Sequence, residues 1–372
     1  MTSPRLEPLR TLHRWLPGYA GARLRDVAGP GRPPAARVWV TIADHFEPWW
    51  RGADERTALD RVRRWTKRWP RIAGRHVDDA GHPACHTFFY PVEQYHPAAV
   101  DALARLANMG IADVEVHLHH DGDNAAAFLD RMGSFVERLH TRHGLLRRDA
   151  GGIRFGFIHG NWALDNSLPG GRFCGLDNEI TLLRGLGCYA DFTLPSAPSP
   201  AQTRTVNTIY WATDDPDRPR SHDAGLPVTA NGAVAGDLLM IPGPLTLNLR
   251  EWRRPLVPRI EVGELAGHCQ PTRHRVTLWK RVSPQIGEDV FIKLFTHGAP
   301  EKNAGPLLED DGVLDRTLRF LAEDCRRSGT RLFVVSAWHM WVAIDGIRRG
   351  VHPVRAVGES RRHRVTRMGA AS

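Results

Sequence analysis

The sequence predicts an α/β fold in which repeated strand–helix units build a distorted seven-stranded (β/α) barrel. Segments rich in β-branched and aromatic residues alternate with segments of helical hydrophobic periodicity from residue 37 to about residue 345. Seven such repeats favour a barrel over an open doubly wound sheet, because successive strands joined by helices tend to lie side by side. A chain of 372 residues is long enough for one barrel with insertions.

The expected elements are short strands and amphipathic helices. The strands cover residues 37–42, 86–90, 114–119, 153–158, 189–194, 290–295 and 331–335. The helices cover residues 55–69, 97–109, 125–143, 178–186, 274–282 and 314–327.

Three segments depart from this rhythm. Residues 1–36 contain Pro17, Pro30, Pro33 and Pro34 and are expected to form an N-terminal extension of the barrel at 37–345. Residues 195–262 are a long loop-rich excursion with short strands at 208–212 and 237–241. This excursion is expected either to cover the barrel mouth as a substrate surface or to pack as an ordinary extension. Residues 346–372 are arginine-rich and poor in apolar residues, which predicts a disordered basic tail.

Composition excludes several classes of protein. The net charge is +9, but it comes almost entirely from scattered arginine, and no nucleic-acid-binding motif accompanies it, so no specific nucleic-acid partner is expected. No stretch approaches ~18 consecutive apolar residues, which predicts no membrane span. Five cysteines without a CxxC spacing indicate reduced thiols, and with no secretory leader pattern the expected location is the cytoplasm.

The most informative stretch is residues 113–124, where a predicted strand ends in histidines and carboxylates. Alternation along a strand places Glu115, His117 and His119 on one face, with Asp121 and Asp123 just beyond. Imidazole and carboxylate together are ligands that borderline divalent metals prefer. The carboxyl ends of barrel strands are where active sites are built, so a metal or catalytic role is favoured over simple hydrogen bonding to loops.

The same residue types recur where other predicted strands end. Five of the seven strand ends carry histidine or carboxylate groups. The residues singled out there are Asp44, His45 and Glu47 after the first strand, Glu93 after the second, His159, Asn161, Trp162 and Asp165 after the fourth, and His297 after residues 290–295.

These motifs resemble the polysaccharide deacetylase (NodB-homology) branch of the glycoside hydrolase/deacetylase barrels. The stretches FGFIHGNWALDNS, GCYADFTLPSAPSPAQTRTVNTIYWA and KLFTHGAPE resemble a bacterial subfamily of that group, over roughly residues 37 to 340. The resemblance implies a barrel fold of that type, a metal ligand at Asp44 and a histidine acid at His297. It places the family's base at Ala43, which cannot accept a proton, so either Asp44 or Glu47 serves as the base or the reaction differs from that of the family.

The second family motif, His-x-x-x-His, corresponds to His119 and Asp123, with His117 as an alternative ligand. The implied cofactor is therefore a divalent metal of the zinc or manganese type, held by Asp44, His117, His119 and Asp123. The implied function is a metal-dependent hydrolase that removes acyl groups from a sugar polymer. The residues expected to bind its substrate are His45, His159, Asn161, Trp162 and Asp165.

Two alternatives remain open from the sequence. One is a glycoside hydrolase or lyase that pairs Asp44 and Glu47 with Asp123 or Asp165. The other is a non-catalytic carbohydrate-binding relative in exopolysaccharide assembly, which the alanine at position 43 favours. Metal content distinguishes the deacetylase-like hydrolase from both.

Overall fold

A computed structural model describes residues 11–28, 31–254 and 257–369. The helices are α2 (Leu12–Ala28), α3 (Glu55–Arg75), α4 (Pro97–Asn108), α5 (Ala125–Thr141), α6 (Glu179–Gly185), α7 (Arg273–Val282), α8 (Glu301–Leu308), α9 (Val313–Ser328), α10 (Ala337–Arg348) and α11 (Pro353–Gly369). The strands are β1 (Arg37–His45), β2 (His86–Pro91), β3 (Ala112–Leu118), β4 (Arg147–Asp149), β5 (Gly152–His159), β6 (Cys188–Asp191), β7 (Tyr210–Ala212), β8 (Leu226–Pro227), β9 (Leu238–Met240), β10 (Thr246–Arg254), β11 (Val257–Glu261), β12 (Gln285–Ile286), β13 (Asp289–Thr296) and β14 (Arg331–Val334).

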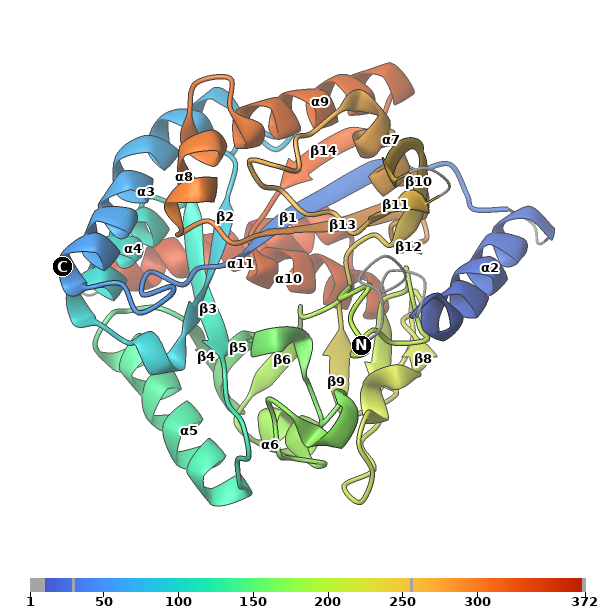
Figure 1. Ribbon diagram of the computed structural model, residues 1–372. Coiled ribbons are helices and arrows are strands. Elements are labelled where there is room, and N and C mark those ends of the chain that lie inside the picture. Colours follow the sequence, from blue (N-terminus) through green and yellow to red (C-terminus); the bar gives the residue numbers. More distant parts are fainter. Residues whose placement is uncertain (1–10, 29–30, 255–256, 370–372) are drawn as a thin grey trace.

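The central sheet is mostly parallel and carries helices around its outside (Figure 1). Its strand order is β12-β13-β1-β2-β3-β5-β6-β9-β7-β8, with β14 paired to β1 and β4 paired to β5. The α/β class is confirmed, and each of the seven predicted strands overlaps an observed one. Within the described ranges no ladder joins β8 to β12, so the strands form an open path, and a closed barrel stays a prediction.

Side-chain alternation divides the core into two layers. Even-numbered residues of β1, such as Val38 and Ile42, pack with the outer helices. Odd-numbered residues, such as Trp39 and Ala43, lie on the other face, where they share a core with Met340 and other residues of α10. Side chains alternate between the two faces along a strand. Odd- and even-numbered residues of the same strand therefore lie on opposite sides of the curved sheet, one inside and one outside.

Local sequence signals begin several of these helices. Asp54, Asn124, Thr272 and Ser336 stand immediately before α3, α5, α7 and α10, and each side chain accepts a hydrogen bond from a backbone N–H of the first turn. Such caps satisfy donors that have no partner inside the helix. At the other end of α9, Gly329 adopts a left-handed conformation (φ 67°) that favours glycine.

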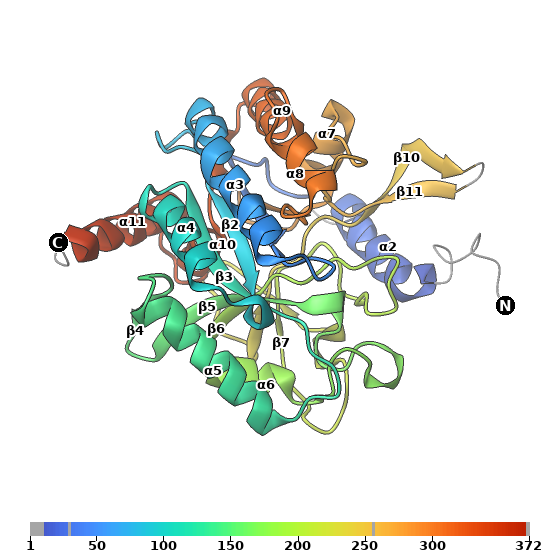
Figure 2. The same ribbon diagram turned by 60° about the vertical axis from the view of Figure 1, so that its left-hand side comes forward.

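The N-terminal segment and part of the excursion pack together. Helix α2 buries Trp15 against Ala197, Val206 and Leu245. The Tyr19 hydroxyl lies 2.9 Å from the Thr246 hydroxyl at the start of β10. The hairpin of β10 and β11 projects from the rest of the protein beside α2 (Figure 2).

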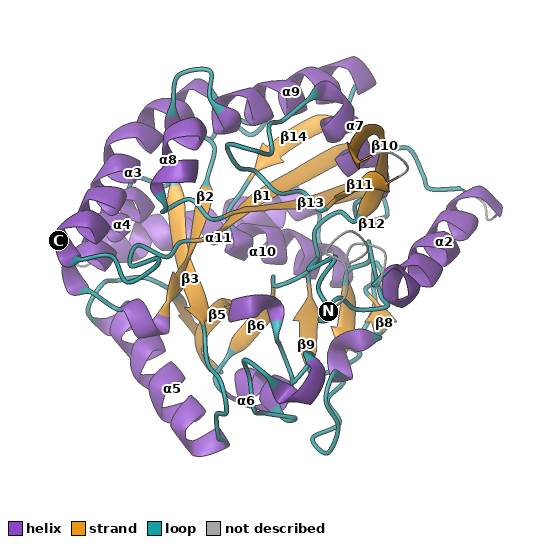
Figure 3. Cartoon of the chain, in the orientation of Figure 1, coloured by secondary structure: helices purple, strands orange, loops and turns teal. Residues whose placement is uncertain are grey.

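The excursion extends the sheet. Its predicted strands at 208–212 and 237–241 are confirmed as β7 and β9, and much of the remainder is loop (Figure 3). Two polar side chains of the excursion form hydrogen bonds inside the fold. Asn207 makes two hydrogen bonds of 2.8 Å to the backbone of Leu245, and the Tyr210 hydroxyl donates to the His222 carbonyl at 2.6 Å. These two residues therefore fit an ordinary packing extension better than a substrate surface over the barrel mouth.

The C-terminal prediction is wrong, because residues 353–369 form helix α11. Ala356 and Val357 are buried against the inner layer, which gives the start of this basic segment an apolar anchor. All five cysteines are free and buried, as expected of reduced thiols. None of the helices in the described part of the chain combines the length and apolar character that a bilayer crossing requires.

A buried ion pair joins the end of the excursion to α7. Arg275 and Glu261 are both fully buried, and their two contacts measure 2.7 and 2.8 Å. Arg275 also donates to three backbone carbonyls, and Trp279 donates to the Glu261 carboxylate at 2.9 Å. Burial alone would raise the pKa of Glu261, but Arg275 outweighs burial and holds that pKa below its usual value.

We predict that Arg275→Met lowers the free energy of unfolding at pH 7 by about 3–5 kcal/mol, because it leaves a buried carboxylate without its partner. The matched control is Arg273→Met, whose exposed guanidinium pairs with Glu323 on the surface; its effect should stay within about 0.5 kcal/mol. Urea denaturation measures both variants.

The pH dependence checks the mechanism of that loss. The lowered pKa of Glu261 means that its stabilisation is present above pH 4.5 and is lost as the pH falls through the lowered pKa. The difference between wild type and Arg275→Met should therefore shrink in acid. An equal loss at pH 7 and at acidic pH would contradict the ion-pair explanation.

Candidate active site

The carboxyl ends of β1, β3 and β13 bring four histidines and one glutamate together. His45 ends β1 and Glu47 follows it, His117 and His119 lie at the end of β3, and His297 follows β13. The histidines are odd-numbered in their strands, so alternation turns them toward the same side of the sheet. We call these five residues the mouth cluster.

The mouth cluster is centred on the Glu47 carboxylate. Glu47 Oε1 lies 3.5 Å from His117 Nε2 and 3.6 Å from His119 Nε2. Donor atoms of Glu47, His117 and His119 all lie within 4.8 Å of one another, and the same holds for His45, Glu47 and His297. Glu47 and His117 are buried, while His119 and His297 are partly exposed, so the cluster can be reached from solvent.

Hydrogen bonds fix the tautomers of two of these imidazoles. His117 Nδ1 donates to the Ile158 carbonyl at 2.8 Å, and His119 Nδ1 is 2.7 Å from Glu93 Oε1. An acceptor beside Nδ1 keeps a proton on that nitrogen, and in a neutral ring the lone pair is then on Nε2. In both rings Nε2 is the nitrogen that lies beside Glu47. Buried Nε2 atoms of His117 and His45 have no hydrogen-bond partner.

Burial and mutual repulsion keep most of the cluster in its basic form. Burial, followed by the neighbouring His297 and His117, holds the pKa of His45 well below its usual value. Burial likewise lowers the pKa of His297. Burial alone would raise the pKa of Glu47, but the surrounding histidines, His117 foremost, outweigh it and lower that pKa. At His119, in contrast, the Glu93 carboxylate outweighs burial and raises the pKa of the imidazole.

Asp44 does not belong to the mouth cluster, which corrects the ligand and base roles predicted for it. Its even position in β1 turns the side chain toward the helices. Its two oxygens contact His86 Nε2 at 3.0 Å and the Gly298 N–H at 2.6 Å. Asp44 therefore holds the loop that carries His297 and does not meet His117 or His119.

Asp123 and His159 also lie outside the mouth cluster, so their predicted roles as mouth ligand and substrate contact are corrected. Asp123 lies 3.1 Å from His120 Nδ1 and forms an ion pair with Arg131. His159 contacts His120 on the helix-facing side of the sheet. His120 and His159 belong with Cys174 and Glu179 to a second group that could hold a metal ion, which we call the buried cluster.

The remaining predicted substrate residues are spread out. Asn161 is exposed, and Trp162 is half-buried against the outer core layer. Asp165 is buried, and burial raises its pKa to about 8; its Oδ2 accepts the Ser221 N–H at 2.7 Å. Asp165 therefore links its loop to the excursion, and of the five predicted substrate residues only His45 joins the mouth cluster.

Three residues of the buried cluster were not predicted as site residues, and Glu93 was singled out only as a carboxylate at a strand end. Glu93 lies in the 3-10 helix η1 (Val92–Gln94) and orients His119. His120, Cys174 and Glu179 meet only because the loop before α6 returns to the end of β3. Adjacency to His119 was a signal for His120, whereas the positions of Cys174 and Glu179 depend on a loop path that no sequence pattern gives.

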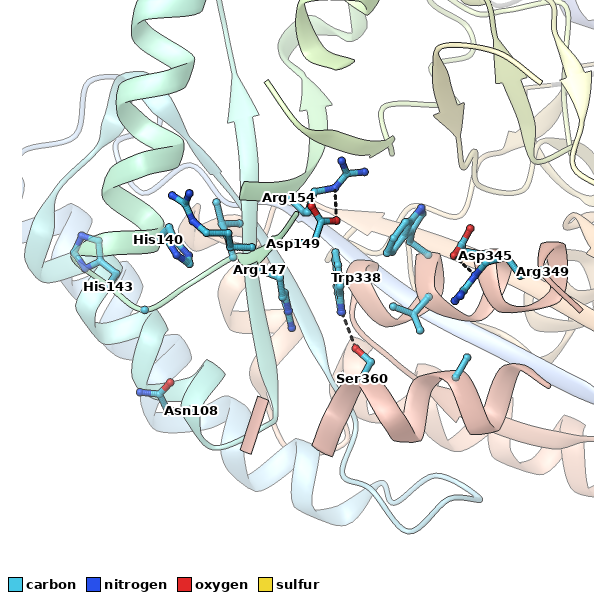
Figure 4. Close-up of a pocket in the computed structure, with 16 residues that line it drawn as sticks. Asn108, His140, His143, Arg147, Asp149, Arg154, Trp338, Asp345, Arg349 and Ser360 are labelled. Carbon is cyan, nitrogen blue, oxygen red and sulfur yellow. Dashed lines mark hydrogen bonds and ion pairs between the residues drawn. The ribbon is translucent and has the colours of Figure 1, made fainter. Parts of the chain in front are cut away.

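A cavity of about 780 Å³ lies elsewhere, among β4, the end of α5, α10 and α11 (Figure 4). Trp338 of α10 donates to Ser360 of α11 beside it at 2.9 Å. Its arginines are paired: Arg147 with Asp113 at 2.8 Å and Arg349 with Asp345 at 2.8 Å. No residue of the mouth cluster lines this cavity, and its arginines are already paired, so the mouth cluster remains the candidate active site.

Comparison with known proteins gives no family assignment: no protein-family model matches the chain, and no curated protein matches its sequence.

We predict that Gly298→Ala lowers the free energy of unfolding by about 1–3 kcal/mol, because the added methyl group overpacks a filled space. An added Cβ would lie 2.2 Å from Asp44 Oδ2 and 2.5 Å from the Trp65 ring. Gly305→Ala in α8 is the control, since the nearest atom to its Cβ is the flexible end of Glu309, 3.6 Å away. Thermal unfolding compares the two, and equal stability of both variants would contradict the crowding.

Proposed function

We infer that this protein is a metal-dependent hydrolase of carbohydrate acyl groups, similar in activity to polysaccharide deacetylases. The observation that carries this proposal is the convergence of imidazole Nε2 atoms on Glu47 at the carboxyl ends of parallel strands. Active sites of parallel α/β folds lie at this end of the strands. The resemblance of residues 37 to 340 to that family supports the same proposal.

The residues present fit a divalent metal ion. His117 Nε2 is a buried lone pair without a partner, and its ring is oriented by a backbone carbonyl, as ligand imidazoles commonly are. His119 has the corresponding carboxylate partner in Glu93. We propose His117 and His119 as ligands, with His45, whose buried Nε2 also lacks a hydrogen-bond partner, completing the set. A bound zinc- or manganese-type ion would polarise an acyl carbonyl and lower the pKa of a water molecule.

The chain's own residues supply the proton transfers. Glu47 is ionised, lies beside both proposed ligands and takes the role that Ala43 and Asp44 cannot fill, accepting a proton from the attacking water. His297 lies across His45, with ring centroids 4.7 Å apart, and is the proposed proton donor to the leaving group. Because its pKa is lowered, His297 has to take up a proton during the reaction before it donates one.

An aromatic side chain near the cluster supports a carbohydrate substrate. The half-buried Trp50 ring lies 6.5 Å from the His297 ring. Flat, partly exposed indoles stack on sugar rings. The glycosidase alternative is less well supported, because Asp44, Asp123 and Asp165 all lie outside the mouth cluster and leave Glu47 without the expected partner.

We predict that His117→Ala loses the mouth metal and that Glu47→Gln retains it while turnover of acetylated oligosaccharides falls roughly 10²–10⁴-fold. His268→Ala, with an exposed ring, is the control and should change neither property. Elemental analysis of protein purified without chelator and an assay of released acetate provide the measurements.

Two results would overturn this function. A wild-type chain without metal in the mouth cluster refutes the metal-dependent mechanism. Metal present but no release of acetate from acetylated oligosaccharides favours the non-catalytic carbohydrate-binding alternative.

A further inference from the structure

The buried cluster is a second set of metal-binding side chains, and the proposed hydrolysis does not use it. His120 follows β3, His159 ends β5, Cys174 lies in the loop before α6, and Glu179 begins α6. All four residues are buried, and their donor atoms lie within 4.8 Å of one another. Four segments that are distant in sequence therefore converge on one point.

Hydrogen bonds fix which nitrogen of each imidazole carries a proton. His159 Nδ1 donates to the Gly160 carbonyl at 2.5 Å, and His120 Nδ1 donates to Asp123 Oδ2 at 3.1 Å. A neutral ring that donates from Nδ1 has its lone pair at Nε2. The two Nε2 atoms are 2.7 Å apart, so two lone pairs would face each other unless a positive charge lies between them. That charge is either an extra proton on His120 or a metal ion.

The carboxylate and the thiol favour the metal ion. Glu179 Oε1 lies 3.2 Å from His120 Nε2, and its Oε2 lies 3.5 Å from His159 Nε2. Cys174 Sγ lies 3.4 Å from the same Oε2. A shared proton would bridge only the two Nε2 atoms of His120 and His159. A metal ion can contact one donor atom from each of the four residues.

Backbone groups support the two acidic donors. The Asn166 N–H donates to Cys174 Sγ at 3.4 Å, and the Asp165 N–H donates to Glu179 Oε2 at 2.7 Å. Outer partners of this kind orient metal ligands and stabilise their charge. Each of the four side chains is thus oriented by a hydrogen bond to a neighbouring group, and one donor atom of each faces the common centre.

We propose that His120, His159, Cys174 and Glu179 form a structural zinc site. Four protein ligands leave no open position for water, as in structural sites, and a thiolate favours zinc over harder ions. Zinc bonds of about 2.0–2.3 Å in tetrahedral geometry place donors roughly 3.3–3.8 Å apart. The contacts of Glu179 Oε2 with His159 and Cys174, 3.5 and 3.4 Å, match this spacing, and the two Nε2 atoms, 2.7 Å apart, need to separate by less than about 1 Å. Binding releases the thiol proton of Cys174 to solvent.

The site would cross-link the loop before α6 to the strands that carry the mouth cluster. That loop has little regular structure, and Asn161, Trp162, Asp165, Asn166 and Phe173 all have positive φ. An irregular loop has many alternative conformations when it is not held in place. A metal cross-link that restricts these conformations therefore stabilises such a loop strongly. The site is independent of the hydrolase function, since it requires only the four ligands.

The test uses Zn²⁺ and Co²⁺ alone as probes on the full chain carrying His117→Ala, which removes the proposed mouth ligand. We expect this protein to retain about one zinc ion per chain. Replacement by Co²⁺ should give a near-ultraviolet thiolate-to-cobalt absorption band. Of the described residues, Cys174 is the only thiol in a potential metal cluster, so the band reports this site. Adding Cys174→Ser should abolish the band and most of the bound zinc, whereas Cys325→Ser, a buried thiol of α9, should preserve both.

Absence of zinc from the His117→Ala chain, or cobalt bound without a thiolate band, overturns the proposal and assigns the His120–His159 contact to a shared proton. The cobalt spectrum needs no change in the buried cluster, so the proposal stays testable even if Cys174→Ser does not fold. Failure of the hydrolase proposal is distinguishable: wild type would then hold zinc only in the buried cluster, with the thiolate band present.

Discussion

The strict alternation of side chains along the parallel strands is the constraint on which both clusters depend. His119 and His120 are neighbours in the chain, yet they lie on opposite sides of the end of β3. His119 joins Glu47 on the inner side, and His120 joins His159 and Glu179 toward the helices. One strand end therefore supplies two chemically different sites, an accessible one at the mouth and a closed one behind it.

The two sides of the sheet are mechanically linked at these strand ends. Gly160 follows His159, and a Cβ at Gly160 would lie 2.3 Å from the His119 ring, so the backbone behind the mouth sets where that ring can lie. Asp44 acts similarly from the helix side, because it holds the Gly298 N–H next to His297. Helix-facing residues thus position mouth residues without contacting a substrate, since packed interiors transmit displacements instead of absorbing them.

Much of the fold was predictable because hydrophobic periodicity is a local property. The strand and helix segments between 37 and 335 follow from it, and alternation brought His117 and His119 together correctly. The same alternation also places His45, and not Asp44, on their face, whereas the family motif points to Asp44. Cys174 and Glu179 could not be placed, because they reach His120 through an irregular loop whose path depends on tertiary contacts. Helix α11 was missed because its buried Ala356 and Val357 are few among many arginines.

The electrostatics of the mouth follow from packing several imidazoles around one carboxylate. Lys293 lies on the same inner face of β13 as His297, and its charge adds to that of the neighbouring histidines in lowering the pKa of His45. Burial lowers the pKa of His45 and His297, whereas at His119 the Glu93 carboxylate outweighs burial and raises the pKa. Burial alone would raise the pKa of Glu47, but the surrounding histidines, His117 foremost, outweigh burial and favour its ionised form. A group of unpartnered lone pairs beside one negative charge is stabilised by a single cation more effectively than by several protons, which supports the metal site proposed for the mouth cluster.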